Sequence, residues 1–141
     1  MALNEEHFKD FINTCRDFNY LVGTKVREAR DGNSLLEIEM RPELCNRWGF
    51  PHGGVIFTLA DTAAGVAAMS AGERRTVTVN AQMNYMRIGV PEGKMTARGK
   101  TVKAGKSLAF VDVEVFDAKD TLVAAGQFTM AYSDEPIPGM K

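Results

Sequence analysis

The sequence predicts an α+β fold in which a curved antiparallel sheet wraps around one long, apolar helix. Residues 54–71 contain a single charge, and a helix that is apolar on nearly every side is a buried helix. Four strand-like segments follow this helix with hairpin-length connections, which favour antiparallel pairing. The helix also contains many small residues, which would let the sheet approach it closely. They are Ala60, Ala63, Ala64, Gly65, Ala67 and Ala68.

Length and composition predict one domain over residues 1–141, with enough chain for a sizeable core. The net charge of -1 gives no electrostatic reason to expect a nucleic-acid or anionic-membrane partner. The N-terminus is acidic and lacks the apolar region of a signal peptide, so we expect a cytoplasmic protein. Its two cysteines, Cys15 and Cys45, are then expected to be reduced thiols rather than a disulfide. With two histidines in total, we expect no metal site.

The remaining elements are placed by periodicity and by turn residues. An amphipathic helix is expected over about 4–18, because Asn4 is a good N-cap and apolar residues recur at helical spacing. Strands are expected over 22–30 and 34–41 before a loop at 42–52, and over 75–88, 94–103, 107–117 and 121–132 after the central helix. The tail, 133–141, is expected to be irregular because it contains two prolines.

The strand at 75–88 alternates between apolar and polar residues, which predicts two different faces. One face carries Val77, Val79, Ala81, Met83 and Tyr85. The other carries Thr76, Thr78, Asn80, Gln82 and Asn84.

Asp61 is the only charged side chain between His52 and Glu73. Burying a carboxylate costs several kcal/mol unless it is paired or neutralised, so its presence in an apolar helix suggests a use. The chemical interpretation is a nucleophile, or a general base that activates water. The alternative is a structural carboxylate that caps or fixes the register of a helix contact.

Gly53 and Gly54 open the central helix, where backbone N–H groups lack helical partners and carry partial positive charge. Glycine lets a ligand approach closely, so either N–H is a candidate oxyanion donor. The alternative is a tight turn that needs glycine.

The spacing of these two features predicts an obligate dimer. Gly53 and Asp61 are eight residues apart, which places them about 12 Å apart along one helix at about 1.5 Å per residue. One substrate carbonyl cannot contact both groups. If both act, the aspartate must come from a second, antiparallel copy of the helix across a two-fold axis.

The run from Asn46 to Gly54, with Asp61 at the end of Leu59-Ala60-Asp61, resembles the hotdog-fold acyl-CoA thioesterases of the phenylacetate-degradation (PaaI) type. The resemblance covers about residues 20–132. It implies the hotdog fold, hydrolysis of acyl-CoA to a carboxylic acid and free CoA, and homodimers often paired into tetramers. It implies no cofactor other than the coenzyme A of the substrate.

The resemblance also implies roles for further residues. Thr78 matches a serine or threonine that holds the attacking water, with a solvent-facing threonine as the alternative. Asn46 could hydrogen-bond the Asp61 carboxylate or the thioester, with an ordinary turn asparagine as the alternative. His52 could orient the substrate carbonyl or the loop, with a structural helix cap as the alternative. The stretch with Lys103, Gly105, Lys106 and Ser107 matches one that contacts CoA in the resembled enzymes. Arg87 could add positive charge, and Gly54, Asn80, Tyr85 and Met86 are further candidates for substrate or CoA contacts. Taken alone, each of the cations is typical of a solvated surface charge.

Two competing functions remain open from the sequence. A hydratase or dehydratase acting on acyl thioesters would need His52 as the partner of an acid. A non-hydrolytic acyl-CoA-binding protein would bind CoA esters without turnover and without dependence on Asp61. No triad or dinucleotide-binding fingerprint is present, and the acyl group cannot be read from this chain.

Overall fold

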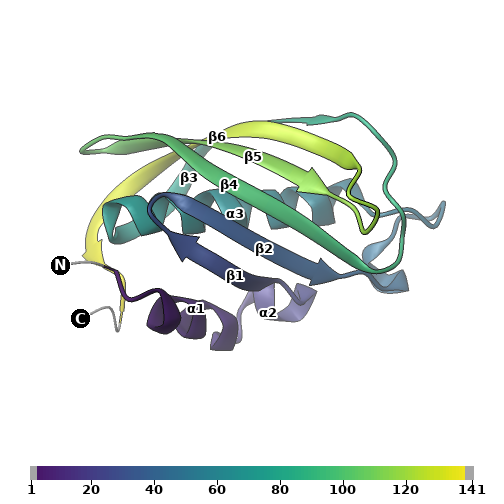
Figure 1. The fold of residues 1–141 in the computed structure, drawn as a ribbon, viewed down its shortest axis with the longest axis horizontal. Helices are drawn as coiled ribbons and strands as arrows, with labels where there is room; N and C mark the ends of the chain where they lie inside the picture. Colours follow the sequence, from purple (N-terminus) through teal and green to yellow (C-terminus); the bar gives the residue numbers. More distant parts are fainter. Residues whose placement is uncertain (1–2, 139–141) are drawn as a thin grey trace.

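The computed structural model describes residues 3–138 and shows one long helix held inside a curved six-stranded sheet (Figure 1). In chain order the elements are α1 (Glu5–Thr14), α2 (Phe18–Val22), β1 (Lys25–Arg30), β2 (Asn33–Glu39), η1 (Pro42–Leu44), α3 (Gly53–Gly72), β3 (Arg74–Tyr85), β4 (Lys94–Ala104), β5 (Leu108–Phe116) and β6 (Leu122–Pro136). The predicted α+β architecture is confirmed, with α3 as the central helix.

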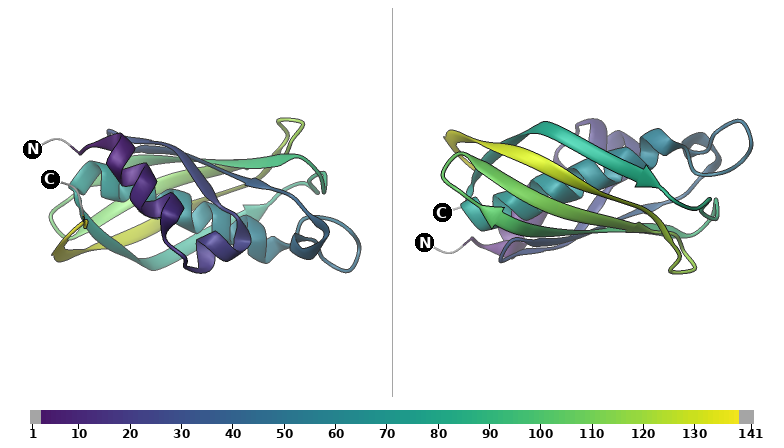
Figure 2. Two further views of the ribbon diagram at one scale, coloured as in Figure 1. Left: turned by 90° about the horizontal axis from the view of Figure 1, so that it is seen from below. Right: turned by 90° about the horizontal axis from the view of Figure 1, so that it is seen from above.

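The sheet is antiparallel throughout and its strands lie in the order β1-β2-β4-β5-β6-β3. The sheet covers one side of α3, while α1 and α2 lie on the opposite side (Figure 2). Because β1 and β3 occupy the two ends of the order, these strands are the two edges of the sheet within one chain.

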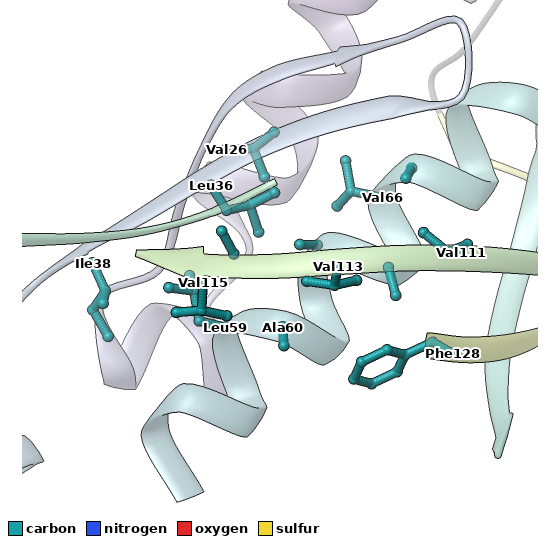
Figure 3. Packing of buried hydrophobic residues seen from close by; sticks show 14 of the residues in the cluster. Val26, Leu36, Ile38, Leu59, Ala60, Val66, Val111, Val113, Val115 and Phe128 are labelled. Carbon is teal, nitrogen blue, oxygen red and sulfur yellow. The ribbon is translucent and has the colours of Figure 1, made fainter. Parts of the chain in front are cut away.

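The core fills the space between α3 and the concave face of the sheet. Figure 3 shows Val113 and Val115 of β5 beside Leu59 and Ala60 of α3, and these four side chains are buried, as is Val111 further along the strand. Alternation along β5 sends every second residue inward, as expected for a strand with one buried face. Burial of this apolar surface stabilises the fold by roughly 25 cal/mol per Å² removed from water.

The small residues of α3 do permit the close approach predicted from the sequence. Ser34 of β2 donates its hydroxyl to the Ala63 carbonyl at 2.7 Å. On β4, a Cβ at Gly99 would lie 2.7 Å from the same carbonyl oxygen, which is closer than Cβ atoms come to an oxygen. Glycine is therefore required at position 99 for the sheet to reach the helix.

The predicted N-terminal helix over 4–18 is wrong as a single element, because it divides into α1 and α2. Asn4 caps α1 as expected, accepting from the His7 N–H at 3.1 Å. Asp17 then starts α2 by accepting from the Tyr20 N–H, so this second cap interrupts the helical period. The strand predicted from residue 22 begins only at Lys25, since α2 uses the preceding residues.

The first edge strand, β1, is covered by side chains of α1. The Asn13 carboxamide exchanges two hydrogen bonds with the backbone of Val26, at 2.8 and 3.0 Å. Lys9 donates to the Arg27 carbonyl, and Glu5 accepts from the Ala29 N–H. These bonds satisfy the outward-facing backbone of β1 and close that edge to further pairing.

The predicted irregular tail is wrong for residues 133–136, which extend β6. Pro136 pairs with Arg74 at the start of β3, and its carbonyl accepts from the Arg75 side chain at 3.1 Å. Proline is tolerated here because it is the last residue of the strand, where no backbone N–H has to donate a hydrogen bond to the neighbouring strand. Residues 139–141 lie outside the described part of the chain.

The predicted faces of β3 are correct only beyond a β-bulge between Thr78 and Asn80. Before the bulge the polar face is turned toward α3, and Val77 and Val79 are 65% and 59% exposed. Beyond it, Ala81 and Met83 pack against the core as alternation predicts. The bulge inserts one residue and so exchanges the two faces, which places Thr78 beside α3.

By length and composition α3 could cross a membrane, with a mean hydropathy of 1.4 over its most apolar window. The fold itself buries 56% of that window, however, as expected for the core helix of a sheet that wraps around it. The apolar character of α3 is therefore explained by its place in the core.

Asp117 closes the turn between β5 and β6 and gives a prediction on stability. The side chain is only 4% exposed and accepts from the backbone N–H groups of Thr121, Val90 and Lys119 at 3.0–3.1 Å. Burial raises the pKa of this carboxyl, but the N–H donors outweigh burial and the pKa lies below its ordinary value. Asp117→Ala is expected to lower the free energy of unfolding by about 1–3 kcal/mol at pH 7, because three donors lose their acceptor.

The same change is expected to cost less in acid. A carboxyl with a lowered folded-state pKa contributes its full stability above the unfolded pKa, near about pH 4, and loses it as the pH falls through the folded pKa. Urea unfolding of both proteins at neutral and acidic pH measures this difference. An equal loss at both pH values would contradict the assigned role.

Candidate active site

Asp61 lies on the open side of α3, where one hydrogen bond holds its carboxylate. Thr78 of β3 donates its hydroxyl to Asp61 Oδ1 at 2.6 Å. Among residues 3–138 no other group donates to this carboxylate, so Oδ2 is free to accept from water or substrate. The structure thus brings together two residues that the sequence singled out separately, and the bulge in β3 is what makes the contact possible.

A cavity of about 320 Å³ opens beside this pair. Its walls come from α3, the first half of β3, the facing side of α1, the start of α2 and Met130 of β6. Sequence reasoning did not assign Phe11 and Ile12 of α1, or Cys15 directly after it, to the site, although these residues line the cavity. Their helical spacing indicated an apolar face, but nothing local to them shows that this face is turned toward Asp61.

His52, Gly53 and Gly54 have different roles at the start of α3. His52 is the N-cap, and its Nδ1 accepts from the Gly54 N–H at 2.8 Å. The Gly54 donor is therefore used within the chain, and the accepting Nδ1 carries no proton. Within the described residues nothing accepts from the Gly53 N–H, which leaves it as the available oxyanion donor of the two.

Asn46 organises the loop before α3. Its Oδ1 accepts from the backbone N–H groups of Trp48 and Phe50 at 3.0 and 3.1 Å, and its own N–H donates to the Phe50 carbonyl. This is the turn role that the sequence left open for Asn46. The carboxamide oxygen is therefore engaged locally and does not contact Asp61 of its own chain.

The end of β3 packs on the start of α3. Tyr85 donates its hydroxyl to the Gly53 carbonyl at 3.0 Å, and burial raises the pKa of this phenol. The following residues, Met86 and Arg87, both donate their backbone N–H to the Val123 carbonyl and expose their side chains. This end of the fold thus joins Asn46, His52, Gly53, Tyr85, Met86 and Arg87.

The predicted CoA-binding turn lies at the opposite end of α3 (Figure 1). Gly105 donates its N–H to the Leu108 carbonyl in the β4–β5 turn, and Arg74, just beyond α3, donates to the Lys106 carbonyl at 2.6 Å. The Ser107 carbonyl accepts a hydrogen bond from the Tyr132 N–H. Lys103 and Lys106 are exposed, and neither forms an ion pair within residues 3–138.

The predicted site residues therefore fall into two groups in one chain. One group surrounds the start of α3. The remaining residues lie further along: Asp61 and Thr78 contact each other near the middle of α3, the Lys103–Ser107 turn lies beyond the end of the helix beside Arg74, and Asn80 follows the bulge on the exposed edge of β3. Since Asp61 lies eight residues beyond Gly53 in α3, about 12 Å along the helix axis, one substrate carbonyl cannot contact both within a chain.

Two further expectations can be compared with the geometry. Cys15 and Cys45 are both free thiols and do not pair with each other. In the part of the chain that the structure describes, no group of three or more His, Cys, Asp or Glu side chains is placed to hold a metal ion.

The sequence profile of the thioesterase superfamily matches residues 49–124, which is more than half of the chain and includes the start of α3, Asp61 and Thr78. The chain belongs to this superfamily. Together with the wrapped-helix topology, this confirms the predicted hotdog fold.

Solved structures support the same assignment of fold and family. A protein from Pseudomonas aeruginosa is 32% identical, with a TM-score of 0.80 over 86% of this chain and 98% of that one. A mutant of the phenylacetic acid degradation protein PaaI from Thermus thermophilus is 28% identical, with a TM-score of 0.76 over 82% and 98%. A Streptococcus mutans protein bound to acetyl CoA is 27% identical, with a TM-score of 0.78 over 88% and 97%. The predicted PaaI-type family is thereby confirmed.

Proposed function

We propose that this protein is an acyl-CoA thioesterase that hydrolyses an acyl- or aryl-CoA thioester to a carboxylic acid and free CoA. The observation that carries the proposal is the Asp61 carboxylate, held through Oδ1 by Thr78 and open at Oδ2 beside a cavity. Membership of the thioesterase superfamily and the similarity to a structure with bound acetyl CoA support it.

In the proposed reaction, Asp61 Oδ2 accepts a proton from water as the water oxygen attacks the thioester carbonyl carbon. The negative charge that forms on the carbonyl oxygen is stabilised by the Gly53 N–H. Collapse of this intermediate breaks the C–S bond, and the departing CoA sulfur takes the proton from Asp61. Direct attack by Asp61, followed by hydrolysis of a mixed anhydride, uses the same two groups.

The site is composite in this proposal, with Asp61 from one subunit and Gly53 from the other. An antiparallel copy of α3 would bring the helix start of one subunit to the Asp61 group of its partner. The β3 edge supports such a dimer, because it is unpaired within residues 3–138 and exposes Val77 and Val79, whereas α1 covers the β1 edge. Two such dimers would form the tetramer that the family resemblance implies.

The competing functions are less well supported. A hydratase that used His52 as its base would need the ring nitrogen that lacks a proton to face substrate, but that nitrogen, Nδ1, already accepts from the Gly54 N–H. A purely binding protein would not need a carboxylate with one free oxygen at the mouth of a cavity.

Thiol release from a panel of alkyl- and aryl-CoA esters tests the activity. The proposal expects turnover of at least one class of ester at rates that depend on Asp61. Tight binding of CoA esters without any thiol release would instead identify a binding protein.

Mixed dimers test whether the site is shared between subunits. We expect a purified heterodimer of Asp61→Asn with Gly53→Pro to retain about half of the wild-type activity, since one of its two sites is intact. A heterodimer of wild type with the double variant is the matched control and should be almost inactive, since both of its sites are broken. The opposite pattern, with activity only in the control, would place each site within one chain.

A further inference from the structure

The cavity beside Asp61 has no role in the hydrolytic step itself. It holds about 320 Å³ and reaches from the Asp61–Thr78 pair to the inner side of α1. Five apolar side chains form much of its wall: Phe11, Ile12, Val66, Met69 and Met130. A carbonyl carbon held at Asp61 would therefore have an apolar space directly next to it.

We propose that this cavity is the acyl chamber of the thioesterase and that the absent side chain of Gly65 sets its depth. The inference rests on the proposed function and adds a substrate class to it. The substrates are thioesters of uncharged, apolar acyl groups with about ten non-hydrogen atoms, taking about 30 Å³ for each.

The direction of the chamber follows from helical spacing. Asp61, Gly65 and Met69 line the cavity and are four residues apart, so they lie one above another on a single face of α3. From Asp61 to Met69 this face extends about 12 Å along the helix axis. An acyl chain that starts at Asp61 would pass over Gly65 and end near Met69.

Nothing in the backbone or the packing of α3 requires a glycine at position 65. Its backbone is ordinary helix without a positive φ, and an added Cβ would meet Met130 Cε at 3.6 Å and Thr76 Oγ1 at 3.7 Å. Both distances are normal van der Waals contacts, so an alanine fits. Glycine inside a helix is less stable than alanine, and the space that its missing side chain leaves open belongs to the cavity.

The lining also argues against charged acyl groups. The ionisable acids of the cavity are Asp17 and Asp61, and no Lys, Arg or His lines it among the described residues. An acyl group ending in a carboxylate would lose its hydration without gaining a cation. Thioesters of dicarboxylic acids should therefore be poor ligands.

Binding of S-alkyl coenzyme A thioethers tests the chamber independently of hydrolysis, since a thioether has no carbonyl to attack. For the wild-type protein, affinity should rise about fourfold per methylene as each is buried, and stop rising near about ten carbons. If thioether affinity shows this limit but no acyl-CoA is hydrolysed, the result supports the acyl chamber and contradicts the proposed hydrolase activity. Affinity that does not depend on chain length would overturn the chamber even in an active enzyme.

Gly65→Ala gives the sharper result. The added methyl group should lower affinity for the longest thioethers relative to the shortest by about tenfold or more, and move the limit to shorter chains. The melting temperature should rise by about 2–5 °C, which shows that the variant is folded. An unchanged length profile, or a change of oligomeric state alone, would assign Gly65 to subunit packing instead.

Two phenylalanines provide a matched pair on the N-terminal helices. Phe11 lines the cavity, whereas Phe18 is 61% exposed and does not. Phe11→Ala should extend the accepted chain length, while Phe18→Ala should leave the profile unchanged. Equal effects of the two changes would overturn the assignment of α1 to the chamber wall.

Discussion

Asp61→Asn is expected to lower kcat for thioester hydrolysis by about 10²–10⁴-fold, the range that a general base contributes. Asparagine has nearly the same shape, and its carboxamide oxygen can still accept the Thr78 hydroxyl that now donates to Asp61 at 2.6 Å. The substitution therefore removes the basic oxygen with little change in packing. Steady-state thiol release, with binding of a non-hydrolysable thioether as a check on the fold, measures the effect.

Thr78→Val is the matched control for the positioning of this carboxylate. It keeps the β-branched shape but removes the donor, so Asp61 stays ionisable and loses its orientation. We expect a smaller loss of kcat, about tenfold, with substrate binding unchanged. Full activity of Asp61→Asn would reject Asp61 as base or nucleophile. A similar loss in both variants would instead show that the pair acts as one unit.

Gly53→Pro is expected to lower kcat by about 10²–10³-fold, the cost of losing one oxyanion donor. Proline removes only the N–H in question, and Gly53 is the first residue of α3 after the His52 cap, where proline is well tolerated. The backbone of His52, with φ -68° and ψ 137°, is also the conformation that precedes proline. The helix should therefore form normally without the donor.

Gly53→Ala is the control, because alanine retains the N–H and adds only a Cβ. That Cβ would lie 3.6 Å from Tyr85 Cε1, an ordinary contact. Alanine should therefore keep most of the activity that proline removes. Equal losses for alanine and proline would indicate a steric requirement for glycine, and full activity of the proline variant would exclude this N–H as the donor.

Much of the fold follows from patterns within single segments. The apolar, nearly uncharged run at 54–71 predicted α3 because a buried helix needs apolar residues on every side. Hairpin-length connections predicted the antiparallel strands, because a short connection can join neighbouring strands only when they run in opposite directions. The errors arose where a competing local signal was hidden, as at Asp17, which begins α2 inside one continuous helical period.

The bulge in β3 shows what alternation alone cannot reveal. Period-two alternation continues through Val77 and Val79, yet the strand gains one residue against β6 and its faces exchange at that point. Whether a bulge forms depends on the register with a partner strand more than forty residues away in the sequence. Thr78 therefore reaches Asp61 by a long-range pairing that no local period encodes.

Asp61 could be singled out from the sequence as a candidate because one carboxylate in an apolar helix is costly wherever that helix packs. The helix-start glycines and the 12 Å spacing were likewise properties of one helix, so they predicted a shared site without any structure. Only the folded chain showed that His52 occupies the Gly54 N–H, that Thr78 orients Asp61, and that α1 encloses a cavity beside them. Local rules govern helices and caps, whereas these contacts join segments that the sequence keeps far apart.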